Sequence, residues 1–155
     1  MYLDESGFAH DMPRTHGYAP RGKRCYGVSD WGAKGRTNVI GAMIGACLIT
    51  VSLFDCNINS DVFHAWAEQD LLPKVPEGAV IVMVCEADGA TRRHNATFHK
   101  RFDTQAMIKN AGFILEYLPP YSPDLNPIEQ KWAQAKAIRR KKQCSISNLF
   151  KKYEF

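Results

Sequence analysis

The stretch Ala79-Val-Ile-Val-Met-Val84 is an unbroken apolar run. Such a run is typical of a strand buried on both faces of a sheet. It lies between two segments with helical spacing of apolar residues. The first opens with Ser60 as its predicted N-cap and ends at Pro73, and the second spans residues 100–111. A buried strand between two helices predicts an α/β fold.

Further apolar segments extend the predicted sheet in both directions. A short strand at the N-terminus ends at Asp4, whereas glycine and proline recur through residues 6–23 and predict a loop or irregular hairpin. Residues 24–30 and 38–54 are rich in Val, Ile, Leu and Cys and predict a meander of two or three strands. We therefore expect a mixed sheet flanked by helices, with Asp4 on a central strand and the three tryptophans in the core.

Composition limits the class of protein. The 155 residues fit one domain, and a net charge of +4 allows a polyanionic partner without requiring one. The five cysteines are scattered without a C-x-x-C pair, which favours reduced thiols in a cytoplasmic protein over a zinc site or disulfides. The longest uncharged run, Thr37 to Phe54, is short for a membrane span and is broken by glycines, so we expect no membrane association.

Two acidic residues are candidates for metal binding. Asp4 follows the first strand, and Glu129 lies in the first turn of a helix that begins at Pro127. Two-metal phosphoryl chemistry requires carboxylates from distant parts of the chain to converge, and Mg²⁺ prefers oxygen ligands. Taken singly, Asp4 is better explained as a surface acid at a strand end, and Glu129 as a partner of the helix dipole. The proline-rich stretch before Glu129 predicts a stiff loop that would fix its position.

Four motifs in this sequence resemble a known family. They are Tyr2-Leu-Asp-Glu-Ser-Gly-Phe8, Gly17-Tyr-Ala-Pro-Arg-Gly-Lys-Arg24, Asn95-Ala-Thr-Phe-His-Lys100 and Leu118-Pro-Pro-Tyr-Ser-Pro-Asp-Leu-Asn-Pro-Ile-Glu-Gln-Lys-Trp132. Together they resemble the bacterial insertion-sequence branch of the mariner-like DDE transposases. The proline-rich block is highly specific, and the resemblance runs from Tyr2 to about Lys142.

The resemblance implies a ribonuclease H-like fold that binds Mg²⁺ or Mn²⁺ at two aspartates and a glutamate, and that cleaves DNA and transfers the strand. Asp4 matches the first aspartate and Glu129 the glutamate. It further implies a catalytic domain over residues 1–142 with a basic tail over residues 143–155. The protein would act on element ends and target DNA at the bacterial nucleoid, and the resemblance allows a homodimer. Family members usually carry a helix-turn-helix module upstream, and this sequence shows none, so we expect no sequence-specific DNA binding from this chain alone.

The second aspartate of the family pattern is displaced. Counting back from Asn95, its place is held by His94, which leaves 34 residues (129 − 94 − 1) before Glu129; counting forward along the apolar run, the place falls on Val84. Ten residues (94 − 84) therefore look inserted. Within them we favour Asp88 as the third ligand because Gly89 lets the chain turn, with Glu86 second and His94 third. We expect this segment to weaken or abolish activity.

Basic residues suggest where DNA would bind. Phosphate contacts require only clustered Lys and Arg side chains, although a solvated helix end explains the second cluster equally well. Three functions stay open: an active strand-transfer domain, an inactive remnant that binds DNA or pairs with intact transposase, and an unrelated metal nuclease on the same fold. The candidate DNA-binding residues are Arg14, Arg21, Lys23, Arg24, Lys136, Arg139 and Arg140.

Overall fold

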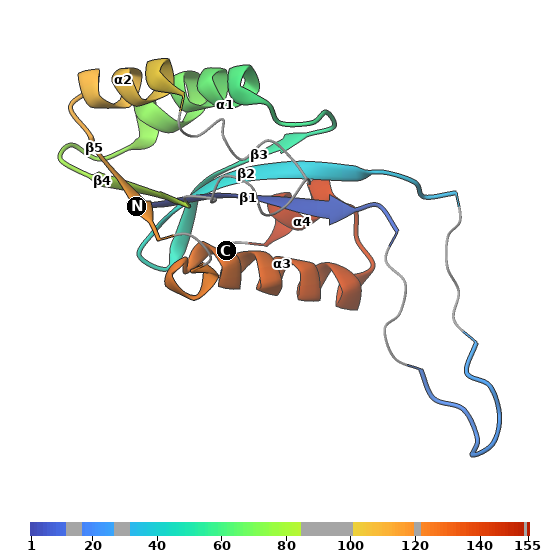
Figure 1. Ribbon diagram of the computed structural model, residues 1–155. Helices are drawn as coiled ribbons and strands as arrows, with labels where there is room; N and C mark the ends of the chain where they lie inside the picture. The colour runs from blue at the N-terminus through green and yellow to red at the C-terminus, as the bar shows by residue number, and fades with distance from the viewer. Residues whose placement is uncertain (12–16, 27–31, 85–100, 120–121, 154) are drawn as a thin grey trace.

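In the computed structural model, the described residues are 1–11, 17–26, 32–84, 101–119, 122–153 and 155. They form a five-stranded sheet between two layers of helices (Figure 1). The mixed sheet flanked by helices that the sequence predicted is therefore confirmed. The elements are β1 (Tyr2–Ala9), β2 (Arg36–Ile44), β3 (Cys47–Phe54), α1 (Ser60–Trp66), the π-helical turn η1 (Ala67–Leu71), η2 (Leu72–Lys74), β4 (Val80–Val84), α2 (Phe102–Asn110), β5 (Ile114–Leu118), η4 (Pro123–Leu125), α3 (Ile128–Lys142) and α4 (Ile146–Lys152).

The strand order is β3-β2-β1-β4-β5, which places β1, the strand of Asp4, at the centre. β1 pairs antiparallel with β2, and β2 with β3, so the first three strands form a meander. A two-residue turn joins β2 to β3, and Gly45 adopts the positive φ of 60° that such a turn favours. β4 and β5 run parallel to β1. The buried run that we used to predict the fold is thus β4, next to the central strand.

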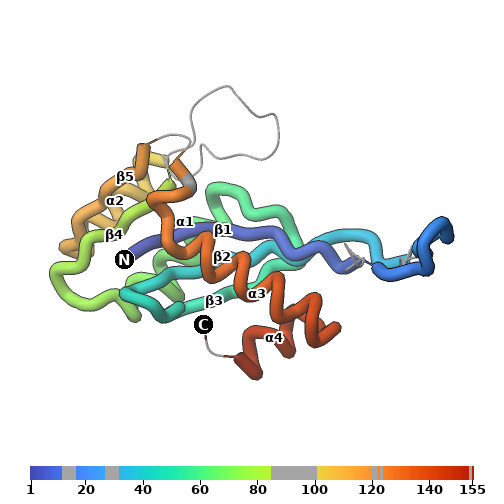
Figure 2. Tube along the Cα trace, turned by 90° about the horizontal axis from the view of Figure 1, so that it is seen from below, coloured from blue at the N-terminus to red at the C-terminus, as the bar shows by residue number. Residues whose placement is uncertain are grey.

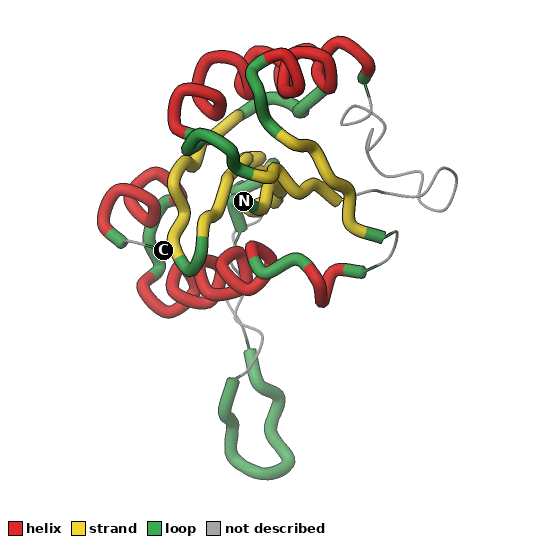
Figure 3. The backbone as a smooth tube through the Cα atoms, turned by 90° about the vertical axis from the view of Figure 1, so that its left-hand side faces the viewer, coloured by secondary structure: helices red, strands yellow, loops and turns green. Residues whose placement is uncertain are grey.

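Each face of the sheet carries its own hydrophobic cluster. α1 and α2 cover one face, and α3 and α4 cover the other (Figures 1 and 3). The two faces alternate along β1 because successive side chains point in opposite directions. Leu3 packs with the α1 cluster, whereas Phe8 packs with the α3 cluster. Side chains on even-numbered positions of β1, Asp4 included, therefore face α3.

Several boundaries differ from the prediction. β1 continues to Ala9, well past Asp4, because its full length pairs with the strongly apolar strand β2. The N-cap of α1 is Asn59, whose side chain accepts a hydrogen bond from the Val62 amide, so Ser60 is instead the first helical residue. Helical structure continues through η1 and η2 to Lys74 instead of ending at Pro73, because proline is tolerated in the first turn of a helix. Residues 24–26 form no strand, and residues 27–31 lie outside the described part of the chain.

The basic segment after residue 142 packs against the body of the protein. Gln143 ends α3 with a left-handed backbone, and α4 then returns over the same face of the sheet. Leu149 is fully buried in the α3 cluster, and the ring of Phe150 meets that of Phe8 edge to face. The carbonyl of Phe155 accepts a hydrogen bond from the Leu48 amide of β3. This segment therefore supplies core contacts as well as positive charge.

Candidate active site

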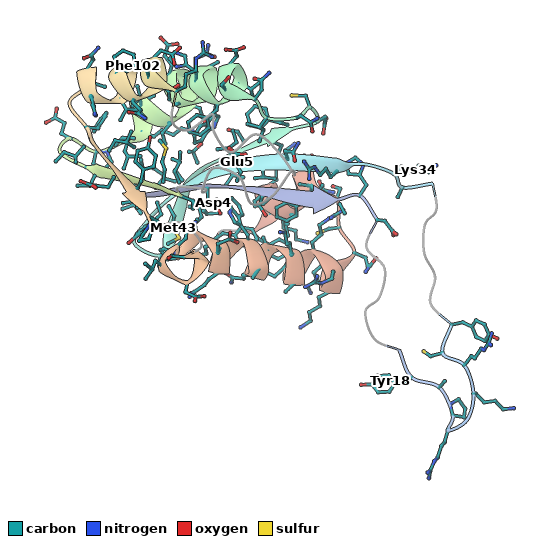
Figure 4. The ribbon with its side chains drawn as sticks, viewed as in Figure 1. Asp4, Glu5, Tyr18, Lys34, Met43 and Phe102 are labelled. Atoms are coloured by element: carbon teal, nitrogen blue, oxygen red, sulfur yellow. The ribbon has the colours of Figure 1, made fainter. Side chains whose placement is uncertain are left out.

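Asp4 and Glu129, which are far apart in sequence, meet at the surface between β1 and α3. Their carboxyl groups lie within hydrogen-bonding reach of each other. β1 brings Asp4 to the α3 side of the sheet (Figure 4), and α3 begins at Ile128, so Glu129 lies in its first turn. Asp4 is half-buried, whereas Glu129 is exposed. Two of the three expected acids are thus brought together.

The surroundings of Asp4 change its protonation. Burial, and after it repulsion from Glu129, together raise the pKa of Asp4 to about 7. Hydrogen bonds from the Glu5 amide and from the Trp132 indole act in the opposite direction, because they favour the charged carboxylate. A proton on Asp4 or a bound cation would relieve this repulsion. All of these ligand atoms are oxygens, so the pair fits a hard divalent cation such as Mg²⁺.

α3 is attached to β1 at two points. Near its start, the Trp132 indole nitrogen donates a hydrogen bond of 3.1 Å to Asp4 Oδ2. Two turns later, the guanidinium of Arg139 donates to the carbonyl oxygens of Ala9 (2.5 Å) and His10 (3.2 Å) at the end of β1. Trp132 and Arg139 are seven residues apart and therefore share one face of the helix. The helix that carries Glu129 is thus fixed along the strand that carries Asp4, as Figure 2 shows for the two elements.

Gly41 makes room for this arrangement. It pairs with Asp4 across β1 and β2, and the Trp132 ring lies directly over it. A Cβ atom at Gly41 would lie 2.6 Å from Cη2 of that ring, which is closer than atoms can approach. The ring is 1% exposed and meets Phe8 and Phe150 edge to face at centroid distances of 6.4 Å. Sequence reasoning placed Trp132 in the core, which is confirmed, but it missed the hydrogen bond to Asp4.

Asn126 is an unusual polar group three residues before Glu129. Its side chain is 2% exposed, and neither side-chain atom has a hydrogen-bond partner within the described residues. An unsatisfied buried amide costs about 1–3 kcal/mol. Its backbone carbonyl accepts a hydrogen bond from the Glu129 amide, so this residue helps to set the first turn of α3. The proline-rich loop therefore ends in a buried polar residue three residues before Glu129.

The candidates for the third acid come after β4 in the sequence. Asp88, Glu86 and His94 lie outside the described residues. Within those residues, no three His, Cys, Asp or Glu side chains are grouped so that they could hold a metal ion. The end of β4 nevertheless locates where the following segment starts, because Leu3 pairs with Met83 and β4 runs parallel to β1. The chain therefore leaves β4 next to Asp4.

The predicted DNA-binding cations lie in two places. Arg21, Lys23 and Arg24 are exposed on a loop that projects far from the sheet (Figures 1 and 4). Arg140 is exposed on α3, and Lys136 is half-buried with its ammonium 5.3 Å from the centre of the Phe8 ring. Arg14 lies outside the described part of the chain.

Arg139 differs from the other predicted cations. It is 6% exposed, and its guanidinium is held by backbone carbonyls, including that of Cys144. Burial lowers the pKa of this arginine. The basic end of α3 suggested a DNA contact, but this side chain serves the attachment of α3 to β1. No helix among the described residues is long and apolar enough to cross a membrane.

Comparison with known proteins agrees with this geometry. Three solved structures of Mos1 share the fold. They are the Mos1 transposase paired-end complex with left transposon end (TM-score 0.66, 16% identity, 89% of this chain and 41% of that one), the Mos1 Strand Transfer Complex (0.63, 15%, 86% and 40%) and the Mos1 mariner paired end complex with Mn (0.57, 14%, 87% and 41%). This chain thus spans about two fifths of the length of those chains.

At these identities the likeness concerns the fold, and the ribonuclease H-like fold that the sequence predicted is confirmed. A search of the curated proteins gives no match. The family model of the DDE superfamily endonucleases matches residues 1–149, which is nearly the whole chain. The protein therefore belongs to the DDE superfamily of endonucleases.

Proposed function

We propose that this chain is the catalytic domain of a mariner-like transposase that cleaves DNA strands and transfers them with the help of Mg²⁺ or Mn²⁺. The observation that carries this proposal is the contact between the carboxyl groups of Asp4 and Glu129 within a DDE superfamily fold. Two of the Mos1 structures support strand cleavage and transfer as the reaction. One is a paired-end complex with a transposon end, and the other is a strand transfer complex. The four sequence motifs support the bacterial insertion-sequence branch and, with it, action at the nucleoid.

The chemistry divides between metal and protein. Two bound cations would stabilise the attacking and leaving oxygens of an in-line displacement at phosphorus. Asp4 and Glu129 would hold them, since Trp132 holds the Asp4 carboxylate and the attachment of α3 to β1 brings the first turn of α3, with Glu129, beside it. The presence of Mn in one of the Mos1 complexes supports a divalent cation for this chain too.

We propose Asp88 as the third ligand. The support is that β4 ends beside Asp4, so an acid shortly after Val84 starts close to the other two. Glu86 and His94 are the second and third choices. Because neither end of the ten-residue segment keeps an acid at the expected place, we further propose that activity is weak. This same displacement favours the alternative function. In that case the chain is an inactive remnant that binds DNA or pairs with intact transposase. We also propose a homodimer as a possible assembly.

Nicking assays test the metal site. The substrate is a supercoiled plasmid with Mg²⁺ or Mn²⁺, and the variants are Asp4→Asn and Glu129→Gln. Both should abolish nicking, whereas Glu68→Gln, an exposed acid on η1, should leave it unchanged. Nicking that survives in both site variants would refute the proposal.

A second pair of variants tests the third ligand. Asp88→Ala should abolish whatever activity the parent has. Deleting the ten extra residues and restoring one Asp before Asn95 should raise activity above that of the parent. If the parent already nicks as fast as the repaired form, the segment supplies a fully working ligand and the proposed impairment is wrong. If neither form nicks, the remnant function is the correct one.

We propose that DNA phosphates contact the cations of the projecting loop and the exposed cations of α3. Each phosphate contact contributes about 0.9 to the slope of log K against log salt concentration. Replacing Arg21, Lys23 and Arg24 by Ala should therefore reduce the magnitude of this negative slope by up to about 3. Lys109→Ala, at an exposed residue of α2, should leave the slope unchanged. Substitution is preferable to deleting the C-terminal segment, because α4 packs into the core.

A further inference from the structure

Trp132 combines two features that a core residue alone would not need. Its indole N–H donates to Oδ2 of Asp4, and its ring occupies the space that Gly41 leaves empty on the strand paired with Asp4. It also lies three residues after Glu129, and residues three apart on a helix are neighbours on its surface. One side chain thus touches the first acid and belongs to the helix of the second.

The hydrogen bond restricts the orientation of the Asp4 carboxylate. A carboxylate has two oxygens and can turn about its bond to the chain, whereas the indole offers one donor in a fixed direction. The ring itself cannot move, because Phe8 and Phe150 pack against its edges and β2 lies beneath it. The donor direction is therefore set by the core. Asp4 is held in place before a cation arrives, so less conformational freedom is lost on binding.

We propose that Trp132 is a positioning residue, whose indole N–H orients Asp4 for the divalent cation. This inference rests on the proposed function and deepens it. Groups that hydrogen-bond to metal ligands typically change metal affinity by about 10–100-fold when they are replaced. We expect an effect at the lower end of this range, because Trp132 holds only one of the expected three ligands.

The test removes the N–H without removing the ring. Site-specific replacement of Trp132 by 3-benzothienylalanine puts sulfur in place of the indole nitrogen and keeps the shape of the side chain. Trp66 provides a matched control, since it is also buried and its indole donates to an aspartate, Asp70, on the opposite face of the sheet. Mn²⁺ affinity of the whole chain is measured by calorimetry, and thermal stability is measured in EDTA.

The expected result is a roughly 10-fold or greater loss of Mn²⁺ affinity for the Trp132 analogue. The Trp66 analogue should bind Mn²⁺ as the wild type does, and both should melt within a few degrees of each other in EDTA. Trp132→Phe provides a second variant without the donor. Unchanged Mn²⁺ affinity in the Trp132 analogue, or an equal loss in both analogues, would overturn the positioning role alone. A wild-type chain that binds no Mn²⁺ would overturn the proposed function together with it.

Discussion

Replacing Asp4 by asparagine should stabilise the metal-free protein at neutral and alkaline pH. Asparagine has nearly the same shape, and its carbonyl oxygen can still accept the hydrogen bond from Trp132. What it removes is a negative charge that is half-buried beside Glu129. The substitution therefore relieves a repulsion that only a cation or a proton otherwise offsets.

The size of the effect follows from the pKa of Asp4. That pKa is about 7 in the folded protein, against an ordinary value of 3.8. Each unit of difference corresponds to about 1.4 kcal/mol, so the full shift would represent roughly 4 kcal/mol. The shift belongs to the pair of Asp4 and Glu129 together, and water around the exposed Glu129 screens part of the repulsion. We therefore expect a gain of about 1–2 kcal/mol in the free energy of unfolding.

The effect depends on pH in a defined direction. Below the ordinary pKa of 3.8, Asp4 is protonated in both the folded and the unfolded chain, so its charge makes no difference. As pH rises from 3.8 to about 7, the unfolded chain ionises first and the wild type loses stability relative to the variant. Above pH 7 the difference stays constant.

Urea denaturation in EDTA at pH 4.5 and pH 8 measures this difference. Glu68→Gln removes an exposed acid and should change stability little at either pH. Excess Mg²⁺ should reverse the order at pH 8, because only the wild type gains binding free energy from both ligands. An Asp4→Asn variant that is no more stable than the wild type at pH 8 in EDTA would refute the reasoning.

Two further substitutions test how the sheet faces are built. Gly41→Ala should lower the free energy of unfolding by about 1–3 kcal/mol, since its Cβ would overlap Trp132; Gly7→Ala, where the nearest atom is 3.5 Å away, should cost far less in the same thermal melts, and equal costs would contradict the overlap. Asp70→Asn should lower the free energy of unfolding by about 1–2 kcal/mol at pH 7. Burial alone would raise the pKa of Asp70, but hydrogen bonds from Lys74 and two hydroxyls outweigh it and lower this pKa to about 2. The ionised Asp70 provides this stability above about pH 4, and the stability is lost as pH falls toward 2. Equal urea midpoints for the wild type and Asp70→Asn at pH 7 would exclude the effect.

The fold was predictable where the pattern of a run of residues favours one type of secondary structure. The six apolar residues up to Val84 favour a buried strand because the run is too short for a helix, and the helical spacing on either side indicates the layers. The length of β1 was not predictable, because Ser6, Gly7 and Ala9 have weak strand preferences of their own. They adopt strand structure because β2 pairs with them along the full length. Tertiary pairing outweighs local preference at this point.

The site was predictable to a different extent. The motifs around Asp4 and Glu129 indicated the acid pair, whereas a buried tryptophan gave no sign of a polar role. One signal was present in the sequence and was passed over. Gly41 interrupts an apolar strand, and a glycine there often marks a close approach by another group. The group that approaches is the Trp132 ring, and its N–H reaches the paired residue Asp4.

The two attachments of α3 separate the stability of the fold from its activity. Trp132 and Arg139 bind α3 to β1 through hydrogen bonds and buried surface, and neither depends on a metal. Asp4 and Glu129 repel each other and weaken the metal-free fold. The third acid is expected after β4, beyond these attachments. A chain that has lost this acid therefore keeps every contact that holds β1, β2 and α3 together. Catalytic damage in the segment after Val84 should thus leave a folded domain that retains the cations proposed to contact DNA.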